Sequence, residues 1–342
     1  MAHILIIRFS AIGDVAMTVP IVTALAEQHP EDCFTMVSQS FLAPLFSYCP
    51  SNVRFKGIDL KTGYPGLKGM YRLYKELSIE KYDSFADIHD VLRTKFLRLL
   101  FRLGGVKVKH INKGRKEKRL LTRKKNKVFL PLKTSTERYA DVFRSIGLPV
   151  TADFHSIFKN STADFQMIDH LTGKKEDKWI GIAPFAKHQG KIYPINRTEE
   201  ILAYFAHQKV KIFLFGGGAK EKEILENWEK KYPNTISVGG KIGLAQELIL
   251  MNYLDVMFSM DSANMHLASL TATQVVSVWG ATHPYAGFYG YGQNPENAVQ
   301  IDLFCRPCSI YGNKPCYRND YACLMEISPK MIIGKISALL NN

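Results

Sequence analysis

The chain has 342 residues, of which 46% are hydrophobic and 22% charged, so it has the length of two average domains and the composition of an ordinary soluble globular protein. No stretch reaches the roughly 20 apolar residues that span a bilayer, and the apolar run at 4–7 is too short for a signal peptide, which excludes an integral membrane protein and predicts a cytoplasmic one. The formal net charge of +14 favours an anionic partner, either nucleic acid, a phosphorylated small molecule or an acidic membrane surface.

Short apolar runs alternate with helical patterns along the whole chain. In the first half the predicted strands are 4–9, 34–37 and 84–88, and the predicted helices are one that ends near His29, 67–77 and 91–103. In the second half the predicted strands are 179–183, 210–215, 236–238, 256–259 and 275–279, and the predicted helices are 197–208 with Thr198 as N-cap, 221–231, 244–253, 264–270 and 329–340. This alternation is typical of parallel sheets covered by helices.

The polar stretch 153–178 predicts the boundary between two domains, 1–165 and 166–342, with the option that the last helix packs back on the first domain. The fold class is α/β, with two doubly wound domains that face each other across a cleft. In such sheets ligands bind beyond the carboxyl ends of the strands.

The turn after the first predicted strand contains Ser10 and Gly13, and it places Asp14 at the start of a helix. Gly13 permits a close approach of another group or a positive φ. Asp14 has two interpretations: a cap that complements the helix dipole, or a general base at the mouth of the cleft.

A second turn, at 260–266, places Asp261 after a predicted strand and before a helix. The backbone N–H groups at that helix start suit a diphosphate, and Asp261 is alternatively an acceptor for ribose hydroxyls. The competing interpretation is an ordinary N-cap with a buried His266.

Two more loops follow predicted strands. In the first, Lys187 and Lys191 either neutralise phosphate charge or belong to a solvated basic loop. In the second, three glycines at 216–218 precede Glu221, a pattern that matches neither the dinucleotide-binding G-x-G-x-x-G nor a Walker loop. The sequence therefore supports neither a dehydrogenase nor a P-loop kinase.

Residues 107–127 carry eleven Lys or Arg residues and one acid, Glu117. A run this one-sided repels itself, which favours an anion-contacting surface over a solvated, mobile loop. RNA is the obvious rival partner, but the segment lacks the aromatic residues on which single-stranded bases stack.

Four of the six cysteines form a C-x2-C-x7-C-x6-C cluster, and the other two, Cys33 and Cys49, are predicted core residues. The cluster consists of Cys305, Cys308, Cys316 and Cys323. Structural zinc is one interpretation, but most such sites use two close cysteine pairs and only Cys305 and Cys308 form one, so packed thiols are favoured. Disulfides are not expected in a reducing compartment.

Taken together, these segments resemble the ADP-heptose–lipopolysaccharide heptosyltransferases, family 9 of the glycosyltransferases. The matching segments are 4–14 with Thr18 and Pro20, 87–95, Lys191 to Pro194, Asp261-Ser262 with 265–268, and 280–284. They extend from residue 4 to about residue 330. The chain departs from the family pattern at Ala263-Asn264, where the family usually has Gly-Pro, and at Tyr193, where it usually has Trp.

The resemblance implies a GT-B fold, with two Rossmann-like domains, and an inverting reaction that needs no metal or other cofactor. It implies that the C-terminal domain binds the ADP-sugar donor, that the N-terminal domain binds the acceptor, and that Asp14 is the catalytic base. The predicted donor-binding residues are Lys187, Lys191, Glu221, Asp261, Ser262, Ala263, Asn264 and His266. The predicted acceptor-binding residues are Ser10, Gly13, Arg93 and Lys95.

The leading hypothesis is therefore the transfer of a heptose or a related sugar from ADP to the inner core of lipopolysaccharide, by a protein peripheral to the cytoplasmic face of the inner membrane. The basic segment 107–127 is expected to contact the anionic membrane surface. One alternative keeps the fold and changes the nucleotide-sugar donor or the glycan acceptor. Another is a basic RNA-binding protein, against which the Asp14 and Asp261 motifs argue, so no nucleic acid is expected as a partner.

Overall fold

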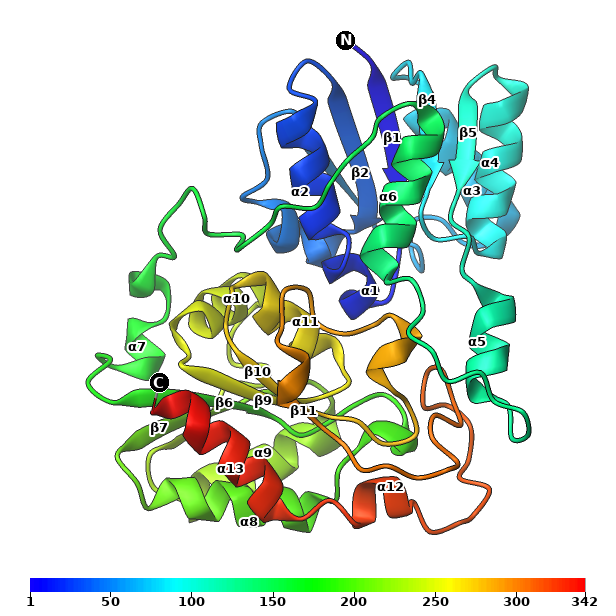
Figure 1. The fold of residues 1–342 in the computed structure, drawn as a ribbon. Helices are drawn as coiled ribbons and strands as arrows, with labels where there is room; N and C mark the ends of the chain where they lie inside the picture. Colours follow the sequence, from blue (N-terminus) through cyan, green and yellow to red (C-terminus); the bar gives the residue numbers. More distant parts are fainter. Residues whose placement is uncertain (342) are drawn as a thin grey trace. The chain divides into compact units, whose positions relative to one another are not determined.

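The structure is a computed structural model that describes residues 1–341 (Figure 1). The chain forms two compact units: the first contains residues 1–113 and 134–160, and the second contains 114–133 and the chain from Ser161 onward. This division differs from the predicted boundary after residue 165. The second unit begins slightly earlier, and it also includes 114–133, a segment that the sequence placed in the first domain.

The first unit is built on a five-stranded parallel sheet with the strand order β3-β2-β1-β4-β5. Its strands are β1 (His3–Ile7), β2 (Cys33–Gln39), β3 (Val53–Ile58), β4 (Ser84–Asp87) and β5 (Lys107–His110). Its helices are α1 (Ile12–Ala16), α2 (Val19–Gln28), α3 (Gly66–Leu77), α4 (Leu92–Leu103) and α6 (Ser135–Ile146), with a 3₁₀ helix, η1 (Ser40–Phe46). The predicted helix before His29 is thus two helices, and the sequence missed β3, β5 and α6.

Helices cover both faces of this sheet (Figure 1). On one face α3 and α4 pack together, and Leu73 of α3 and Phe101 of α4 share a core with Leu5 and Ile7 of β1. On the other face α2 and α6 contact each other. The central strand β1 is apolar from Ile4 to Ile7 because both of its faces are buried.

The second unit is built on a six-stranded parallel sheet with the order β11-β10-β9-β6-β7-β8. Its strands are β6 (Lys178–Ala183), β7 (Val210–Leu214), β8 (Thr235–Ser237), β9 (Val256–Met260), β10 (Val275–Val278) and β11 (Ala298–Val299). Its helices are α5 (Arg115–Thr122), α7 (Asp169–Thr172), α8 (Ile195–Ala206), α9 (Ala219–Lys231), α10 (Leu244–Tyr253), α11 (Ala263–Leu270), α12 (Ala322–Met325) and α13 (Pro329–Leu340). Four short 3₁₀ helices complete it: η2 (Phe165–Met167), η3 (Gln189–Lys191), η4 (Pro284–Ala286) and η5 (Pro295–Asn297).

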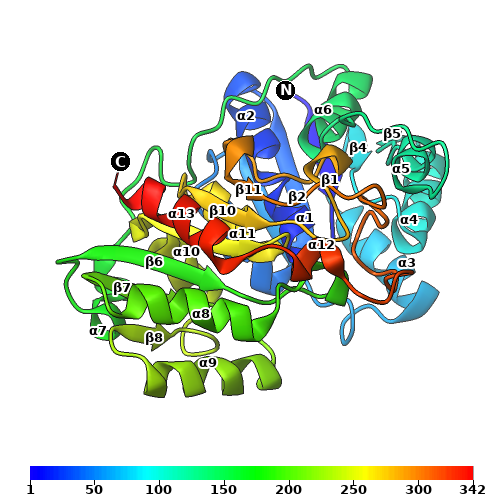
Figure 2. The ribbon, with the colours of Figure 1, turned by 60° about the horizontal axis from the view of Figure 1, so that its bottom comes forward.

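One face of the second sheet is covered by α8, α9 and α13, and Figure 2 shows α8 and α9 along β6, β7 and β8. The last helix, α13, packs here, since its Ile332 and Ile336 join the core that contains Phe205 of α8. The option that this helix packs back on the first domain stays a prediction. Helices α10 and α11 contact each other away from this core.

Helix α8 starts earlier than the sequence predicted. Its N-cap is Pro194, and the hydroxyl of Thr198 donates to the Pro194 carbonyl oxygen at 3.2 Å from inside the first turn. The prediction of Thr198 as N-cap is wrong because Pro194 already sets the extended backbone from which the helix begins.

Because all strands of each sheet are parallel, the carboxyl ends of the strands share one edge in each unit. Each of the chemistry-bearing turns lies at such an edge. No helix within residues 1–341 is both long enough and apolar enough to cross a membrane.

Candidate active site

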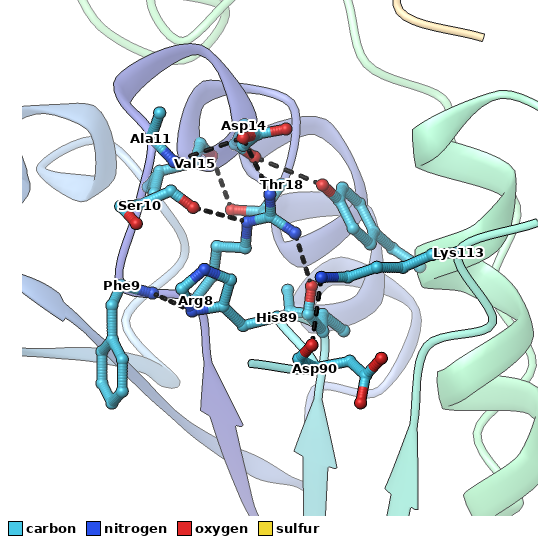
Figure 3. Close-up of polar contacts among 12 residues, drawn as sticks. Arg8, Phe9, Ser10, Ala11, Asp14, Val15, Thr18, His89, Asp90 and Lys113 are labelled. Atoms are coloured by element: carbon cyan, nitrogen blue, oxygen red, sulfur yellow. Dashed lines mark hydrogen bonds and ion pairs between the residues drawn. The ribbon is translucent and has the colours of Figure 1, made fainter. Parts of the chain in front are cut away.

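Arg8 organises the carboxyl edge of the first sheet (Figure 3). It follows β1 and is buried, and its guanidinium donates from Nε to the Ser10 carbonyl oxygen at 3.0 Å and from Nη1 to the Ile88 carbonyl oxygen at 2.8 Å. Its Nη2 lies 2.9 Å from Oδ2 of Asp14. One side chain thus ties the turn after β1, the loop after β4 and the candidate base together.

Asp14 is the third residue of α1, and its Oδ2 also accepts from the Ala11 backbone N–H at 3.2 Å. The hydroxyl of Tyr139 donates to the Asp14 carbonyl oxygen at 3.4 Å, which fixes the start of this helix against α6. The Asp14 side chain is nevertheless 33% exposed. Both interpretations of Asp14 are therefore compatible: it caps the helix with one oxygen, and the carboxylate stays accessible.

His89 lies in the same group of residues but has a different protonation behaviour (Figure 3). Its Nδ1 accepts from the Phe9 backbone N–H at 3.4 Å. Burial, and then the positive charges of Arg8 and Lys113, lower the pKa of His89 to about 3. The ring is therefore neutral near pH 7. Because His89 is only 7% exposed whereas the Asp14 side chain is 33% exposed, Asp14 is the more accessible of the two candidate bases.

A buried ion cluster supports this edge from behind. One oxygen of Asp87, at the end of β4, accepts from the backbone N–H groups of His89 and Asp90 at 2.9 Å each. Arg98 of α4 lies 3.3 Å from Asp87 and 3.1 Å from Asp90. The cluster fixes the loop that holds His89 and the carbonyl oxygen that Arg8 binds.

The structure separates the predicted acceptor residues into two groups. Ser10 lies in the turn before α1, and Gly13 is a buried residue of α1 directly before Asp14. Arg93 and Lys95 are exposed on α4, outside the ion cluster. The sequence missed Arg8 and Arg98, although an arginine directly after a buried apolar strand, as Arg8 is, was a usable signal.

Asp261 is the centre of the corresponding edge of the second sheet. It follows β9 and is 4% exposed, and its Oδ2 lies 2.9 Å from Nζ of Lys191 and accepts from the Thr282 hydroxyl at 2.7 Å. Lys191 comes from the loop after β6, and Thr282 from the loop after β10. Three neighbouring strand ends thus meet on one carboxylate, which the half-buried ammonium of Lys191 neutralises.

Buried Arg306 holds the loop that presents Thr282. Its guanidinium donates to the carbonyl oxygens of Trp279 at 3.0 Å, Gly280 at 2.7 Å and Thr282 at 3.1 Å. The sequence singled out 280–284 but assigned no role to Thr282, and it missed Arg306, because their roles depend on contacts far along the chain.

Gly190 explains how closely these loops pack. Its carbonyl oxygen accepts from the Ala281 backbone N–H at 2.8 Å. A Cβ atom at Gly190 would lie 2.9 Å from the Gly312 carbonyl oxygen, so a larger residue would push the loop away. The position of Lys191 depends on this close approach.

The other predicted donor residues take different places in the second unit. Ser262 is the N-cap of α11, but its side chain makes no capping hydrogen bond. Ala263 and Asn264 are the first two residues of the helix, and His266 is buried within the next turn. Lys187 is exposed after β6, and Glu221 accepts from the backbone N–H groups of Gly217 and Gly218 at 2.9 and 3.4 Å. The structure therefore brings Lys191, Asp261 and the α11 start together, whereas Glu221 caps α9 after β7.

The four clustered cysteines line a single hollow of about 10 Å³, and all are free thiols. Burial raises the pKa of Cys323 to about 12 and also raises the pKa of Cys308, so these sulfurs are protonated. Among residues 1–341, no three His, Cys, Asp or Glu side chains are grouped so as to hold a metal ion.

The basic segment is ordered and divided between the units. Its first part is β5, and the remainder, from Gly114 onward, belongs to the second unit. Lys118 is buried with its Nζ 4.3 Å from the centre of the Phe288 ring, and Nζ of Lys127 donates to the carbonyl oxygens of Cys305, Arg306 and Pro307 at 2.9, 2.7 and 3.0 Å. The segment is therefore anchored, and several of its cations have roles inside the protein.

Comparison with known proteins gives a consistent result. The family model of glycosyltransferase family 9 (heptosyltransferase) matches residues 70–315. Lipopolysaccharide core heptosyltransferase OpsX of Haemophilus influenzae is 26% identical over 288 residues, which cover 82% of this chain and 79% of that protein.

Two solved structures share the fold over nearly all of both chains. A family 9 glycosyl transferase from Veillonella parvula superposes with a TM-score of 0.76 at 19% identity, covering 99% of this chain and 97% of that one. The ADP-heptose lipopolysaccharide heptosyltransferase II of E. coli superposes with a TM-score of 0.70 at 17% identity, covering 99% and 98%. The predicted GT-B fold with two Rossmann-like domains is thereby confirmed. Since the family model spans well over half of the chain, this protein is an enzyme that belongs to glycosyltransferase family 9, the heptosyltransferases.

Proposed function

We propose that this glycosyltransferase transfers a heptose, or a closely related sugar, from an ADP-sugar to the inner core of lipopolysaccharide, with inversion and without a metal ion. The observation that carries the proposal is Asp14, a carboxylate held at a strand end by Arg8 yet one-third exposed, in a chain of this family. The names of relatives agree with these substrates, since one acts on the lipopolysaccharide core and another is an ADP-heptose transferase.

The second unit would bind the donor. The first N–H groups of α11 provide partial positive charge beside β9, where a diphosphate would bind, and Lys191, which is paired with Asp261, would offer further N–H donors there. As the bond to ADP breaks, negative charge grows on the diphosphate, and fixed donors of this kind stabilise it without reorganisation. This charge compensation takes the place of a metal ion in the proposal.

The first unit would activate the acceptor. A sugar hydroxyl attacks the anomeric carbon, the bond from that carbon to the ADP oxygen breaks, and the hydroxyl proton passes to Asp14. A single displacement of this kind inverts the anomeric centre, and its transition state resembles an oxocarbenium ion. Arg8 would keep the Asp14 carboxylate oriented while it accepts the proton.

The proposed partners follow from these substrates. They are an ADP-sugar and an anionic core acceptor, and the enzyme would be peripheral to the cytoplasmic face of the inner membrane, where the acceptor is lipid-linked. No nucleic acid partner is included.

The decisive experiment is a mass-spectrometric transfer assay over a panel of ADP-sugars and core acceptors. We expect one product, whose mass gain equals a heptose or a related sugar, with stoichiometric release of ADP. Thermal stabilisation by ADP should accompany it and should be lost in Asp261→Ala. No product from any pair, together with tight RNA binding at physiological salt, would overturn the proposal in favour of the RNA-binding alternative.

A further inference from the structure

Helix α4 has two apolar faces on opposite sides. Thr94, Leu97 and Phe101 are buried against the first sheet. Leu92, Leu99 and Leu103 are 79%, 53% and 77% exposed. Spacings of seven and eleven residues return to the same side of a helix within about 40°. The three leucines thus form one outward stripe along the whole helix, and the half-buried Phe96 lies within it.

Cations border this stripe. Arg93, Lys95 and Arg102 are exposed on α4, and the helix contains no Asp or Glu. The fourth cation, Arg98, is directed inward, where it binds Asp87 and Asp90. The surface of α4 is therefore apolar along its centre and positive along its borders.

The neighbouring helix extends this surface. Helix α3 packs beside α4 (Figure 1). The rings of Tyr74 and Phe101 meet edge to face, with their centres 5.0 Å apart. On α3, Leu67 is 61% and Tyr71 is 46% exposed, with the exposed cations Lys68 and Lys75. The acid of α3, Glu76, is occupied by Tyr64 and Arg72.

We propose that the outer face of α4, extended by α3, is the surface that docks this protein on an anionic phospholipid bilayer. Exposed leucines at helical spacing are unfavourable in water unless another apolar phase covers them. An amphipathic helix with leucines on one face and Lys or Arg at its borders binds at the boundary between headgroups and acyl chains, and anionic headgroups satisfy the cations.

The charges argue against other occupants. Two copies that paired through this stripe would bring Arg93, Lys95 and Arg102 of each close together, with no acid on α4 to compensate. Single-stranded RNA would need a series of exposed aromatic rings for stacking, whereas this surface offers only the half-buried Phe96 and Tyr71, whose ring has Nζ of Lys75 at 5.1 Å from its centre.

This surface is separate from the predicted membrane contact through 107–127, which stays a prediction: Lys118 and Lys127 are held inside the second unit, but most other cations of that segment are exposed. It also gives Arg93 and Lys95 a role other than acceptor binding, as ligands of lipid phosphates. Helix α4 starts at the end of β4, whose Asp87 pairs with Ile7 of β1, so the stripe begins at the sheet edge that carries Asp14. That last relation rests on the proposed function, whereas bilayer binding itself does not.

The test is co-sedimentation of the full chain with vesicles of phosphatidylcholine alone or mixed with phosphatidylglycerol. We expect binding to the anionic vesicles only, and binding that weakens with salt. The variant Leu99→Gln/Leu103→Gln should bind at least about tenfold more weakly, because two side chains no longer enter the acyl boundary. The variant Lys95→Gln/Arg102→Gln should bind about 25-fold more weakly, since each cation near an anionic surface contributes about fivefold.

Two matched controls lie on the second unit. Leu130→Gln/Met331→Gln removes two exposed apolar side chains, and Lys124→Gln/Lys125→Gln removes two exposed cations of the basic segment. Both should bind vesicles as the unmodified protein does. Equal binding by Leu99→Gln/Leu103→Gln, or loss of binding in Lys124→Gln/Lys125→Gln alone, would overturn the proposal. So would a dimer in light scattering that Leu99→Gln/Leu103→Gln dissociates.

A transfer assay with a lipid-free core acceptor separates this inference from the proposed function. Leu99→Gln/Leu103→Gln should retain full turnover on that acceptor and lose it only on an acceptor embedded in vesicles. Vesicle binding without any transfer would leave the docking surface intact and contradict the proposed function. Transfer to the lipid-free acceptor without vesicle binding would support the proposed function and contradict the docking surface.

Discussion

The two sheet edges use an aspartate and a cation in contrasting ways. At the first edge, Asp14 meets the buried Arg8, and the Asp14 side chain stays 33% exposed. At the second edge, Asp261 is 4% exposed and binds both Lys191 and Thr282 through the same oxygen. Both carboxylates are paired with a cation at 2.9 Å, but only the exposed one can be reached by a substrate hydroxyl, whereas the buried one positions its partners. The difference in exposure, rather than in residue type, predicts that Asp14 acts on the reaction and that Asp261 builds the donor site.

The largest expected effect tests this contrast directly. Asp14→Asn should lower kcat by about 10²- to 10⁴-fold, the usual contribution of a general base, while ADP binding stays nearly unchanged. Asp261→Asn should show the opposite pattern, with weaker ADP binding. Steady-state kinetics and calorimetric ADP titration measure the two quantities. Retained turnover in Asp14→Asn would end the assignment of Asp14 as the base.

The second effect is on stability. Lys191→Met leaves Asp261 buried without its cation, which should cost about 2–4 kcal/mol of unfolding free energy, somewhat below the range for a fully buried pair. The double variant Lys191→Met/Asp261→Asn should recover part of that loss, because the uncompensated charge is gone. Urea unfolding of the three proteins provides the comparison. If Lys191→Met were as stable as the unmodified protein, the buried Asp261 carboxylate would not need the Lys191 cation for its stability.

The third prediction concerns the pH dependence of stability, to which one buried histidine in each unit contributes. Burial lowers the pKa of His89 to about 3 and that of His283 to about 4, from an ordinary value of 6.5. At a pH between the folded and the unfolded pKa of each histidine, the unfolded chain binds more protons than the folded chain. The free energy of unfolding therefore falls as the pH drops below about 7. Each histidine should account for about 2 kcal/mol lost between pH 8 and pH 5.

The histidine variants separate these two contributions. His89→Gln and His283→Gln should each flatten the pH dependence by that amount, as measured by urea unfolding at pH 8 and pH 5. An unchanged pH dependence in His89→Gln would mean that the folded protein binds a proton there, and His89 would then compete with Asp14 as a base.

The last prediction is that removing metal ions has no effect on the transfer rate. If Lys191 and the α11 amides carry the diphosphate charge, then EDTA should leave the transfer rate unchanged, and protein purified without chelators should contain less than stoichiometric zinc. Metal analysis and a chelator titration of the rate measure this. Loss of transfer on chelation, with recovery on adding a divalent ion, would assign the charge compensation at the second edge to a metal.

Much of the fold was predictable because its central strands are continuous apolar runs. The predicted helices 244–253 and 329–340 agree with α10 and α13. The missed strands β3 (Val53–Ile58) and β5 (Lys107–His110) lie at the two ends of the first sheet and carry charged residues. An edge strand is held by backbone pairing on one side only, so its side chains show little of the apolar pattern that identifies a buried strand.

The sequence by itself determined the α/β class, the strand-end turns and the residues of interest in them, because local hydrophobic period and turn chemistry encode these features. Only the tertiary structure decided which side chains meet: Arg8 with Asp14, Lys191 and Thr282 with Asp261, and Lys127 with the carbonyl oxygens of 305–307. It also decided which apolar face of α4 enters the core, since both faces repeat with the helical period. The physical reason is that pairing and burial depend on groups that are distant along the chain and become neighbours only in the folded protein.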